Sequence, residues 1–227
     1  MKFQSLILAL SLSTFALLSV QSCKEKAAPV SDENLATAAD SAGIKYMILP
    51  ESAVITWEGS KPTGKHTGTI KLASGELFVE KLTLSGGKFV MDMNTIEVTD
   101  LEGKDKEDLE GHLKGLTEES ADHFFNVAKF PTATYEITSV ETGKTNTANT
   151  QVNGNLTIKG ITKAVAIQCN FNGDQVTVTV ESDPIVINRT DFGVQYGSKS
   201  IFKDLGDKFI DDNITIKLNF TAKAVAQ

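Results

Sequence analysis

The chain has 227 residues, a formal net charge of -7 and 41% hydrophobic residues. An acidic chain with no basic cluster argues against a nucleic-acid-binding protein, and equally against attachment to anionic lipid through charge. The stretch from 44 to 227 is long enough for one domain with a sizeable core.

The N-terminus has the layout of an export signal. Residues 1–22 contain one charged residue, Lys2, and an apolar run from Leu6 to Val20 that is short for a bilayer span. Cys23 follows Ser22 directly, as at a lipoprotein processing site where the cysteine becomes the acylated N-terminus. We therefore expect a signal peptide over 1–22 and lipidation of Cys23. Ordinary cleavage without lipidation is the alternative.

The segment from 23 to 43 is predicted to be a flexible tether. It is rich in Ala, Ser, Asp and Glu and has no periodic apolar face. With Cys23 acylated, the tether would hold the domain over 44–227 at a membrane. Only Cys169 would then remain, so no disulfide could form within the chain, and a lone strand cysteine is usually a small buried hydrophobe.

Apolar residues alternate with polar ones in several stretches of the domain. This spacing is typical of antiparallel strands with one dry and one wet face. Asn172-Gly173-Asp174 is a tight-hairpin signal, and we interpret Gly86-Gly87 as another turn between strands. About eight strands are expected, enough to close a barrel. The alternating sets are Leu82 and Leu84; Phe89, Met91 and Met93; Val165, Ile167, Cys169 and Phe171; Val176, Val178 and Val180; and Ile214, Ile216, Leu218 and Phe220.

One region breaks this alternation. Leu109, His112, Leu113 and Leu116 have helical spacing, which predicts a short amphipathic helix from about 105 to 115. Thr117, followed by two glutamates, predicts the start of a second short helix.

Both predicted helices lead into an aromatic cluster of Phe124, Phe125 and Phe130. Pro131 disfavours helix at the preceding residue and marks the change to strand. We interpret 100–130 as a lid over one mouth of the barrel. Plain packing of these rings in a core is the alternative.

The three histidines and the only arginine are the candidates for polar chemistry. His66, His112 and His123 do not have the spacing of a metal motif, so we predict no metal site. The chain also lacks a G-x-S-x-G motif, so no catalytic residue is assigned. Arg189 either pairs with Asp191 to fix its loop, which we favour, or faces the head group of an amphiphile at the barrel mouth.

Four motifs occur in series between Ile44 and Phe220. They are Trp57-Glu58-Gly59 with Lys61 and Gly64–Gly68; His112-Leu113-Lys114 with Asp122–Pro131; Val152–Lys163; and Asn188–Gly193. Together these motifs resemble those of the YceI family of polyisoprenoid-binding-like proteins. One departure from the family pattern is that Gly115–Glu119 looks inserted, with His123 within the Asp-Phe-Phe motif.

This resemblance implies an all-β fold, an eight-stranded antiparallel lipocalin-like barrel with a short helical lid. It also implies a cavity that takes an isoprenoid chain, such as a polyprenyl or quinone tail. We expect His66, His112, His123 and Arg189 at a polar mouth. The residues expected in the cavity are Phe89, Met91, Phe124, Phe125, Phe130, Tyr135, Val165, Ile167, Val178, Ile216 and Leu218.

The expected function is binding of a long-chain apolar lipid, for carriage or storage in the bacterial cell envelope, facing the periplasm rather than the cell surface. No enzymatic activity, cofactor or nucleic-acid partner is expected, and the oligomeric state, monomer or dimer, is left open. Two alternatives remain. One is an envelope enzyme that uses His66, His112 and His123, and the other is a partner-binding lipoprotein whose barrel is filled.

Overall fold

The computed structural model describes residues 35–39, 42–143 and 147–226. The predicted signal peptide, Cys23 and most of the predicted tether lie outside these residues. No helix in the described ranges is long and apolar enough to cross a membrane. The strands are β1 (Ile44–Ile48), β2 (Val54–Lys61), β3 (Gly64–Glu80), β4 (Thr83–Val98), β5 (Thr132–Thr142), β6 (Thr150–Ile158), β7 (Ile161–Gly173), β8 (Thr177–Ser182), β9 (Ile185–Asn188) and β10 (Asn213–Ala224). The helices are α1 (Gly103–Lys114) and the 3-10 helices η1 (Pro50–Ser52), η2 (Arg189–Phe192) and η3 (Gly206–Lys208).

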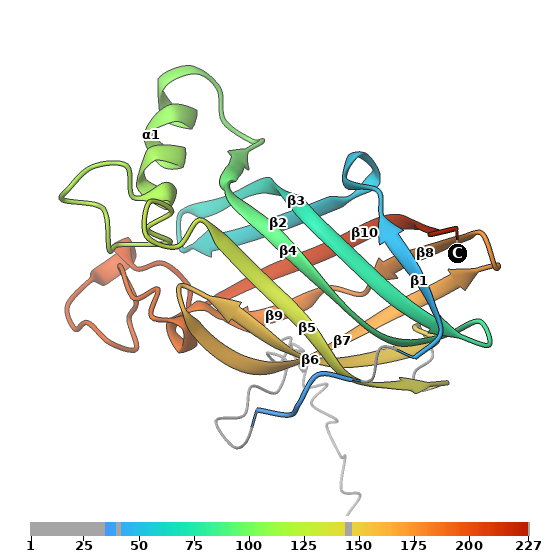
Figure 1. Cartoon of the computed structure of the whole chain (residues 1–227). Coiled ribbons are helices and arrows are strands. Elements are labelled where there is room, and N and C mark those ends of the chain that lie inside the picture. Colours follow the sequence, from blue (N-terminus) through green and yellow to red (C-terminus); the bar gives the residue numbers. More distant parts are fainter. Residues whose placement is uncertain (1–34, 40–41, 144–146, 227) are drawn as a thin grey trace, which may run out of the picture.

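The strands form one closed antiparallel barrel (Figure 1). The ring runs β10-β2-β3-β4-β5-β6-β7-β8 and closes where β8 pairs with β10. The short strand β1 lies between β10 and β3 beyond the end of β2, and β9 pairs with β10 beyond the end of β8. Ten strands therefore fill eight positions, and the predicted eight-stranded barrel is confirmed.

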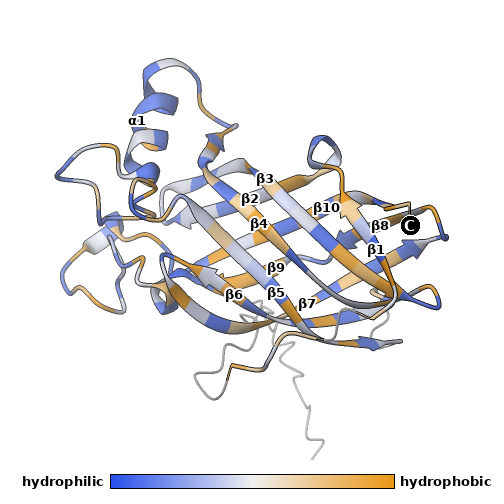
Figure 2. Cartoon of the chain, viewed as in Figure 1, coloured by the Kyte–Doolittle hydropathy of each residue, from blue (hydrophilic) through white to orange (hydrophobic). Residues whose placement is uncertain are grey.

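Alternation along the strands turns apolar side chains inward, and Figure 2 shows the alternation along the strands. In β6 every second residue is buried. Two members of the predicted sets are exceptions, because Leu82 and Val176 are 54% and 65% exposed. Leu82 belongs to the two-residue turn between β3 and β4, and Val176 to the turn between β7 and β8.

The two predicted turns have different outcomes. The hairpin signal at Asn172-Gly173-Asp174 is confirmed, and the Asp174 carboxylate accepts hydrogen bonds from the Val176 and Thr177 N–H groups, both at 2.8 Å. The turn predicted at Gly86-Gly87 is wrong, because both glycines lie within β4. Gly87 has φ +153°, and a Cβ there would lie 2.5 Å from the Glu76 carbonyl oxygen. The neighbouring strand therefore requires glycine at this position.

Helix α1 matches the first predicted helix, and its C-terminus is capped by Gly115, whose φ of 70° is left-handed. It extends from one end of the barrel, after β4 (Figure 1). The second helix predicted from Thr117 is wrong. The Ser120 N–H donates to the Thr117 carbonyl at 3.1 Å, which closes a turn. A further turn is closed by the His123 N–H, which donates to the Ser120 carbonyl at 3.0 Å, and the chain then folds back onto α1, where the Phe125 N–H donates to the Leu113 carbonyl at 3.1 Å.

The barrel end away from α1 is filled by side chains. Tyr46, Leu77, Cys169 and Val178 are each 1% exposed, and the void among the side chains on this side is only about 20 Å³. Tyr46 on β1 reaches the β7–β8 turn, where its hydroxyl donates to the Asp174 carbonyl at 2.9 Å. Burial raises the pKa of the Cys169 thiol to about 12, so Cys169 acts as a small buried hydrophobe.

Candidate ligand-binding cavity

The half of the barrel next to α1 encloses a cavity of about 390 Å³, within the range typical of ligand-binding sites. Its walls are formed by inward-facing side chains of the strands and are mainly apolar. Polar side chains come chiefly from the barrel end near α1. The apolar lining residues contributed by strands include Ile55, Trp57, Ile70, Phe89, Met91, Met93, Ile96, Ala133, Leu156, Ile158, Val165, Ile167, Ile185, Ile187, Ile214, Ile216 and Leu218.

Two stacked rings close the inner end of this cavity. Phe89 on β4 and Tyr135 on β5 have ring centroids 5.2 Å apart at an interplanar angle of 24°. Both rings border the cavity and also the small void in the filled half, as do Ile167 and Leu218. These four side chains therefore form a partition across the barrel, called the Phe89–Tyr135 partition below.

Tyr135 is fixed in this partition by its hydroxyl and by a glycine. The hydroxyl donates to the Val165 carbonyl at 2.9 Å and lies 3.1 Å from the Val152 carbonyl. Its ring packs on Gly154 of β6, where a Cβ would lie 2.4 Å from Tyr135 Cζ. Burial raises the pKa of Tyr135, so the phenol stays neutral.

The opposite end of the cavity is covered by α1 and the segment that follows it. Leu109, His112 and Leu113 from α1, with Phe124 and Phe125, line the cavity. Phe124 is buried at 6% exposure. This arrangement confirms the lid predicted from the sequence.

Two of the three histidines meet in the lid. The His112 Nε2 and His123 Nδ1 atoms are 2.8 Å apart, so one proton shared between them makes a hydrogen bond. Tyr196 packs against both rings, with centroid distances of 4.7 Å to His112 and 4.2 Å to His123. Burial, and then the charge of His123, lower the pKa of His112. Because Tyr196 lies between η2 and β10, this contact joins the lid to the 193–212 loop.

His66 forms a separate pair at the cavity lining. Its Nδ1 atom lies 2.9 Å from Asp100 Oδ2, and the Thr67 N–H donates to the other carboxylate oxygen at 2.9 Å. Partial burial opposes ionisation of Asp100, but the bonds from Thr67 and His66 hold its carboxyl pKa below the usual value. In the described ranges, no three His, Cys, Asp or Glu side chains form a group that could hold a metal ion.

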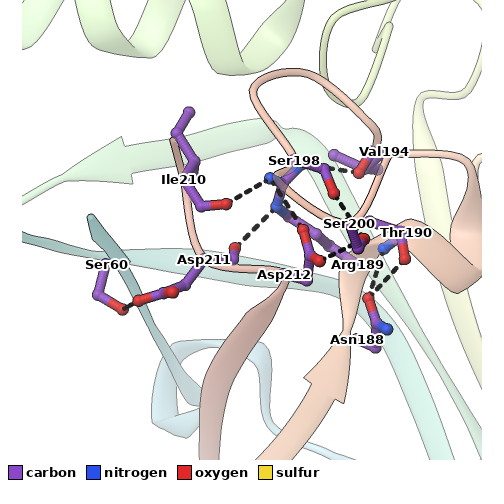
Figure 3. Close-up of polar contacts among 10 residues, drawn as sticks. All are labelled: Ser60, Asn188, Arg189, Thr190, Val194, Ser198, Ser200, Ile210, Asp211 and Asp212. Atoms are coloured by element: carbon purple, nitrogen blue, oxygen red, sulfur yellow. Dashed lines mark hydrogen bonds and ion pairs between the residues drawn. The ribbon is translucent and has the colours of Figure 1, made fainter. Parts of the chain in front are cut away.

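Arg189 is buried at the cavity wall, with only 2% exposure. Its guanidinium donates to three backbone carbonyls of the 193–212 loop, those of Asp211 and Ile210 at 3.0 Å and of Val194 at 2.8 Å (Figure 3). Its ion-pair partner is Asp212, 3.6 Å away, so the favoured pairing with Asp191 is wrong. Asp191 shares the short helix η2 with Arg189, whereas the arginine side chain reaches the far end of the loop.

Most of the predicted cavity residues line the cavity, but two do not. Val178 belongs to the filled half, where it pairs in register with Ala222. Phe130 packs on Gly160, and Lys129 Nζ lies 5.2 Å from its ring centroid. The residues that do line the cavity are Phe89, Met91, Phe124, Phe125, Tyr135, Val165, Ile167, Ile216 and Leu218.

Of the residues predicted at the polar mouth, His66, His112 and Arg189 line the cavity. His123 contacts His112 but is not part of the cavity lining. The sequence reasoning missed Trp57, Tyr196 and Ile210. For Trp57 a signal existed, because it alternates with Ile55 on β2. Tyr196 and Ile210 lie in a loop with no periodicity, so no pattern marked them.

Arg189 tests how the loop is held. Replacement by lysine keeps the charge but loses the planar fork that reaches three carbonyls. We expect Arg189→Lys to lower the free energy of unfolding by about 1–3 kcal/mol, because buried carbonyls lose their donors. Chemical denaturation measures this change, with Lys208→Ala on the same loop as the exposed control. An Arg189→Lys value within about 0.5 kcal/mol of wild type would contradict this role.

His112 should make stability depend on pH. Since its pKa is lowered in the folded protein, its neutral form contributes stability that is fully present above the unfolded pKa of about 6.5. That contribution is lost as the pH falls from there through the lowered pKa. We expect His112→Gln to reduce the loss of stability between about pH 6.5 and 5. The matched control, His66→Gln, leaves the His112–His123 pair intact. Equal pH dependence in wild type and His112→Gln would refute the assignment.

Several known proteins resemble this chain in sequence. A UPF0312 protein from Ectopseudomonas mendocina (strain ymp) is 35% identical over 108 residues, which cover 47% of this chain and 50% of the relative. A UPF0312 protein from Yersinia pestis (strain Pestoides F) is 38% identical over 84 residues, covering 37% of this chain and 36% of the relative. The chain thus spans half or less of the length of these curated relatives.

Solved structures show the same fold at low sequence identity. Burkholderia cenocepacia BcnA has a TM-score of 0.61 and 17% identity, covering 78% of this chain and 99% of BcnA. A polyisoprenoid binding domain from Saccharophagus degradans, described as implicated in plant cell wall breakdown, has a TM-score of 0.58 and 16% identity, covering 80% of this chain and 99% of that domain.

A family model, the YceI-like domain, matches residues 46–222. This match begins in β1, ends in β10 and includes the whole ring of strands, the lid and the 193–212 loop. The chain therefore belongs to the family of proteins with a YceI-like domain.

Proposed function

We propose that this protein binds the tail of a long-chain apolar lipid, of the polyisoprenoid or quinone type, and carries or stores it in the cell envelope. The observation that supports this most directly is the cavity of about 390 Å³, with apolar walls and polar groups at one end. Such a cavity favours a slim apolar guest whose head group remains near His66 and His112.

Hydrophobic burial alone is sufficient for useful affinity. Each buried CH₂ contributes about 0.8 kcal/mol, so ten of them contribute roughly 8 kcal/mol before the costs of association. Association subtracts at least about 4 kcal/mol, so a net value near 8 kcal/mol, which corresponds to a Kd near 1 μM, requires about fifteen buried CH₂ groups. The head group therefore needs no strong anchor, which agrees with an arginine whose donors are used by the loop.

The comparisons add support at the level of the fold. The Saccharophagus degradans domain is described as binding polyisoprenoid, and it shares the barrel with this chain. We extend that ligand class to this protein because its own cavity is lined mainly by Ile, Leu, Val, Met and Phe side chains.

The described residues fit a binding protein better than an enzyme. His66 pairs with Asp100, while His112 and His123 pair with each other, so the three histidines form no common site. The Cys169 thiol is buried and its pKa is raised to about 12, which disfavours the nucleophilic thiolate. The filled-barrel alternative is not favoured, because only one half of the barrel is filled.

We also propose that the protein is exported and anchored by acylation of Cys23, facing the periplasm. This proposal rests on the apolar run from Leu6 to Val20 and on the position of Cys23 directly after it.

A pair of tryptophan substitutions tests the cavity. Ile216 lines the cavity, whereas Val178 is 1% exposed in the filled half. We expect Ile216→Trp to keep the melting temperature of the apo protein while lipid occupancy falls, because the indole takes the place of the guest. Val178→Trp should lose about 1–3 kcal/mol through overpacking. Thermal unfolding and extraction of bound lipid measure both effects. Similar large destabilisation by both variants, with no lipid on wild type, would refute the binding function.

The anchor is tested by Cys23→Ala. Without the acyl acceptor, the protein should leave the membrane fraction or accumulate as unprocessed precursor. Cell fractionation and the intact mass of the protein measure this, with Cys169→Ala as the cysteine control. An unchanged membrane fraction and unchanged mature mass for Cys23→Ala would contradict lipidation.

A further inference from the structure

The 193–212 loop exposes apolar side chains to solvent. Ile201 and Phe202 are 42% and 47% exposed at its outer turn, and Tyr196 is 39% exposed. Within the described ranges, the strongly exposed large apolar residues include two aromatic ones, Tyr196 and Phe202, and both belong to this loop. We call Ile201 and Phe202 the loop tip.

Polar contacts, some of them buried, hold this loop tip in place (Figure 3). Arg189 binds both ends of the loop and pairs with Asp212. The Ser200 hydroxyl donates to the same Asp212 carboxylate at 2.6 Å and lies 2.9 Å from the hydroxyl of Ser198, which is fully buried. The Phe202 N–H donates to the Ser198 carbonyl at 2.8 Å. These hydrogen bonds and the ion pair fix the backbone of the loop, so the loop tip is held in an exposed position.

The loop tip stands at the end of the barrel that contains the cavity. The same loop contributes Tyr196 and Ile210 to the cavity lining. In Figure 1 the loop and α1 extend from the same end of the barrel, opposite the β3–β4 and β7–β8 turns. Leu116, 65% exposed just after α1, adds a further apolar side chain at this end.

The charges around the loop tip suit a lipid interface. Lys199 and Lys203 flank it, and Asp204 and Asp207 follow, so the loop has no strong net charge. Lys199 Nζ lies 4.0 Å from the Phe209 ring centroid. Lysine stems can lie along apolar surface with the ammonium in water, and aromatic rings favour the membrane interface. Attraction to anionic lipid is not required.

We propose that the loop tip inserts into the surface of a bilayer and places the cavity mouth against it. This inference rests on the proposed function, because an apolar chain could then enter the cavity without crossing water. A bilayer fits the tip better than a protein does, since a stable protein interface buries about 1,200–2,000 Å² in total. The loop tip offers only two projecting side chains, those of Ile201 and Phe202.

The first experiment compares the two ends of the full-length protein in phosphatidylcholine vesicles. A nitrobenzoxadiazole probe is attached to Phe202→Cys or to Leu82→Cys, which is 54% exposed in the β3–β4 turn at the other end. The chain without an introduced cysteine gives the background from Cys23 and Cys169. Brominated or spin-labelled acyl chains then quench any probe that enters the bilayer.

We expect quenching several-fold stronger at 202 than at 82. Tethering through the N-terminus alone would bring both ends near the membrane without insertion, so equal quenching would overturn the proposal. The fluorescence of the probe at 202 is also measured without vesicles. If it changes with protein concentration, the loop tip contacts a second copy of the chain, and the proposal is overturned.

The second experiment measures transfer of a dansyl-labelled prenol between vesicles. Ile201→Asp with Phe202→Asp should slow transfer several-fold while binding of the probe in detergent is unchanged. The matched control is Leu82→Asp with Val176→Asp, which alters two exposed apolar residues at the other end. Equal rates for the two double variants would overturn the proposal. If the wild type fails to bind the prenol in detergent, the proposed function is wrong. The quenching result still shows whether the loop tip enters the bilayer.

Discussion

The width of an eight-position barrel is the constraint on which this structure depends. Such a barrel is just wide enough to be filled by its own side chains or to hold one slim guest. Here both arrangements occur in one molecule, because the Phe89–Tyr135 partition separates the filled half of the barrel from the half that encloses the cavity. The filled half stabilises the fold without a disulfide among the described residues, so the other half can remain open. Gly154 makes the partition possible, because any larger residue would clash with the Tyr135 ring.

The mouth depends on contacts between segments that are distant in the sequence. Arg189 fixes the 193–212 loop, and Tyr196 in that loop packs on the His112–His123 pair of the lid. Loop and lid are therefore joined through one aromatic cluster. Because His112 and His123 can share one proton but repel when both are charged, acidification weakens this contact.

The alternation of apolar residues predicted the inward faces of the barrel, since side-chain direction follows directly from the strand period. Alternation does not show, however, where along the barrel axis an inward-facing residue lies. Val178 and Ile216 both lie in alternating apolar stretches. The register of β8 and β10 nevertheless places Val178 in the filled half and Ile216 at the cavity. The partner of Arg189 could not be predicted either, because Asp212 lies across a loop without periodicity. Helical spacing and the aromatic cluster located the lid correctly, while its second predicted helix is a series of turns.

The central claim is that the cavity holds an apolar lipid. Native mass spectrometry of the mature protein, purified from its own host and followed by organic extraction, tests this claim directly. The account predicts a native population one lipid mass heavier than the same sample measured under denaturing conditions, and recovery of a lipid with a long apolar tail from the extract. A single species at the mass of the protein alone, with no extractable lipid across several mild detergents, would contradict it.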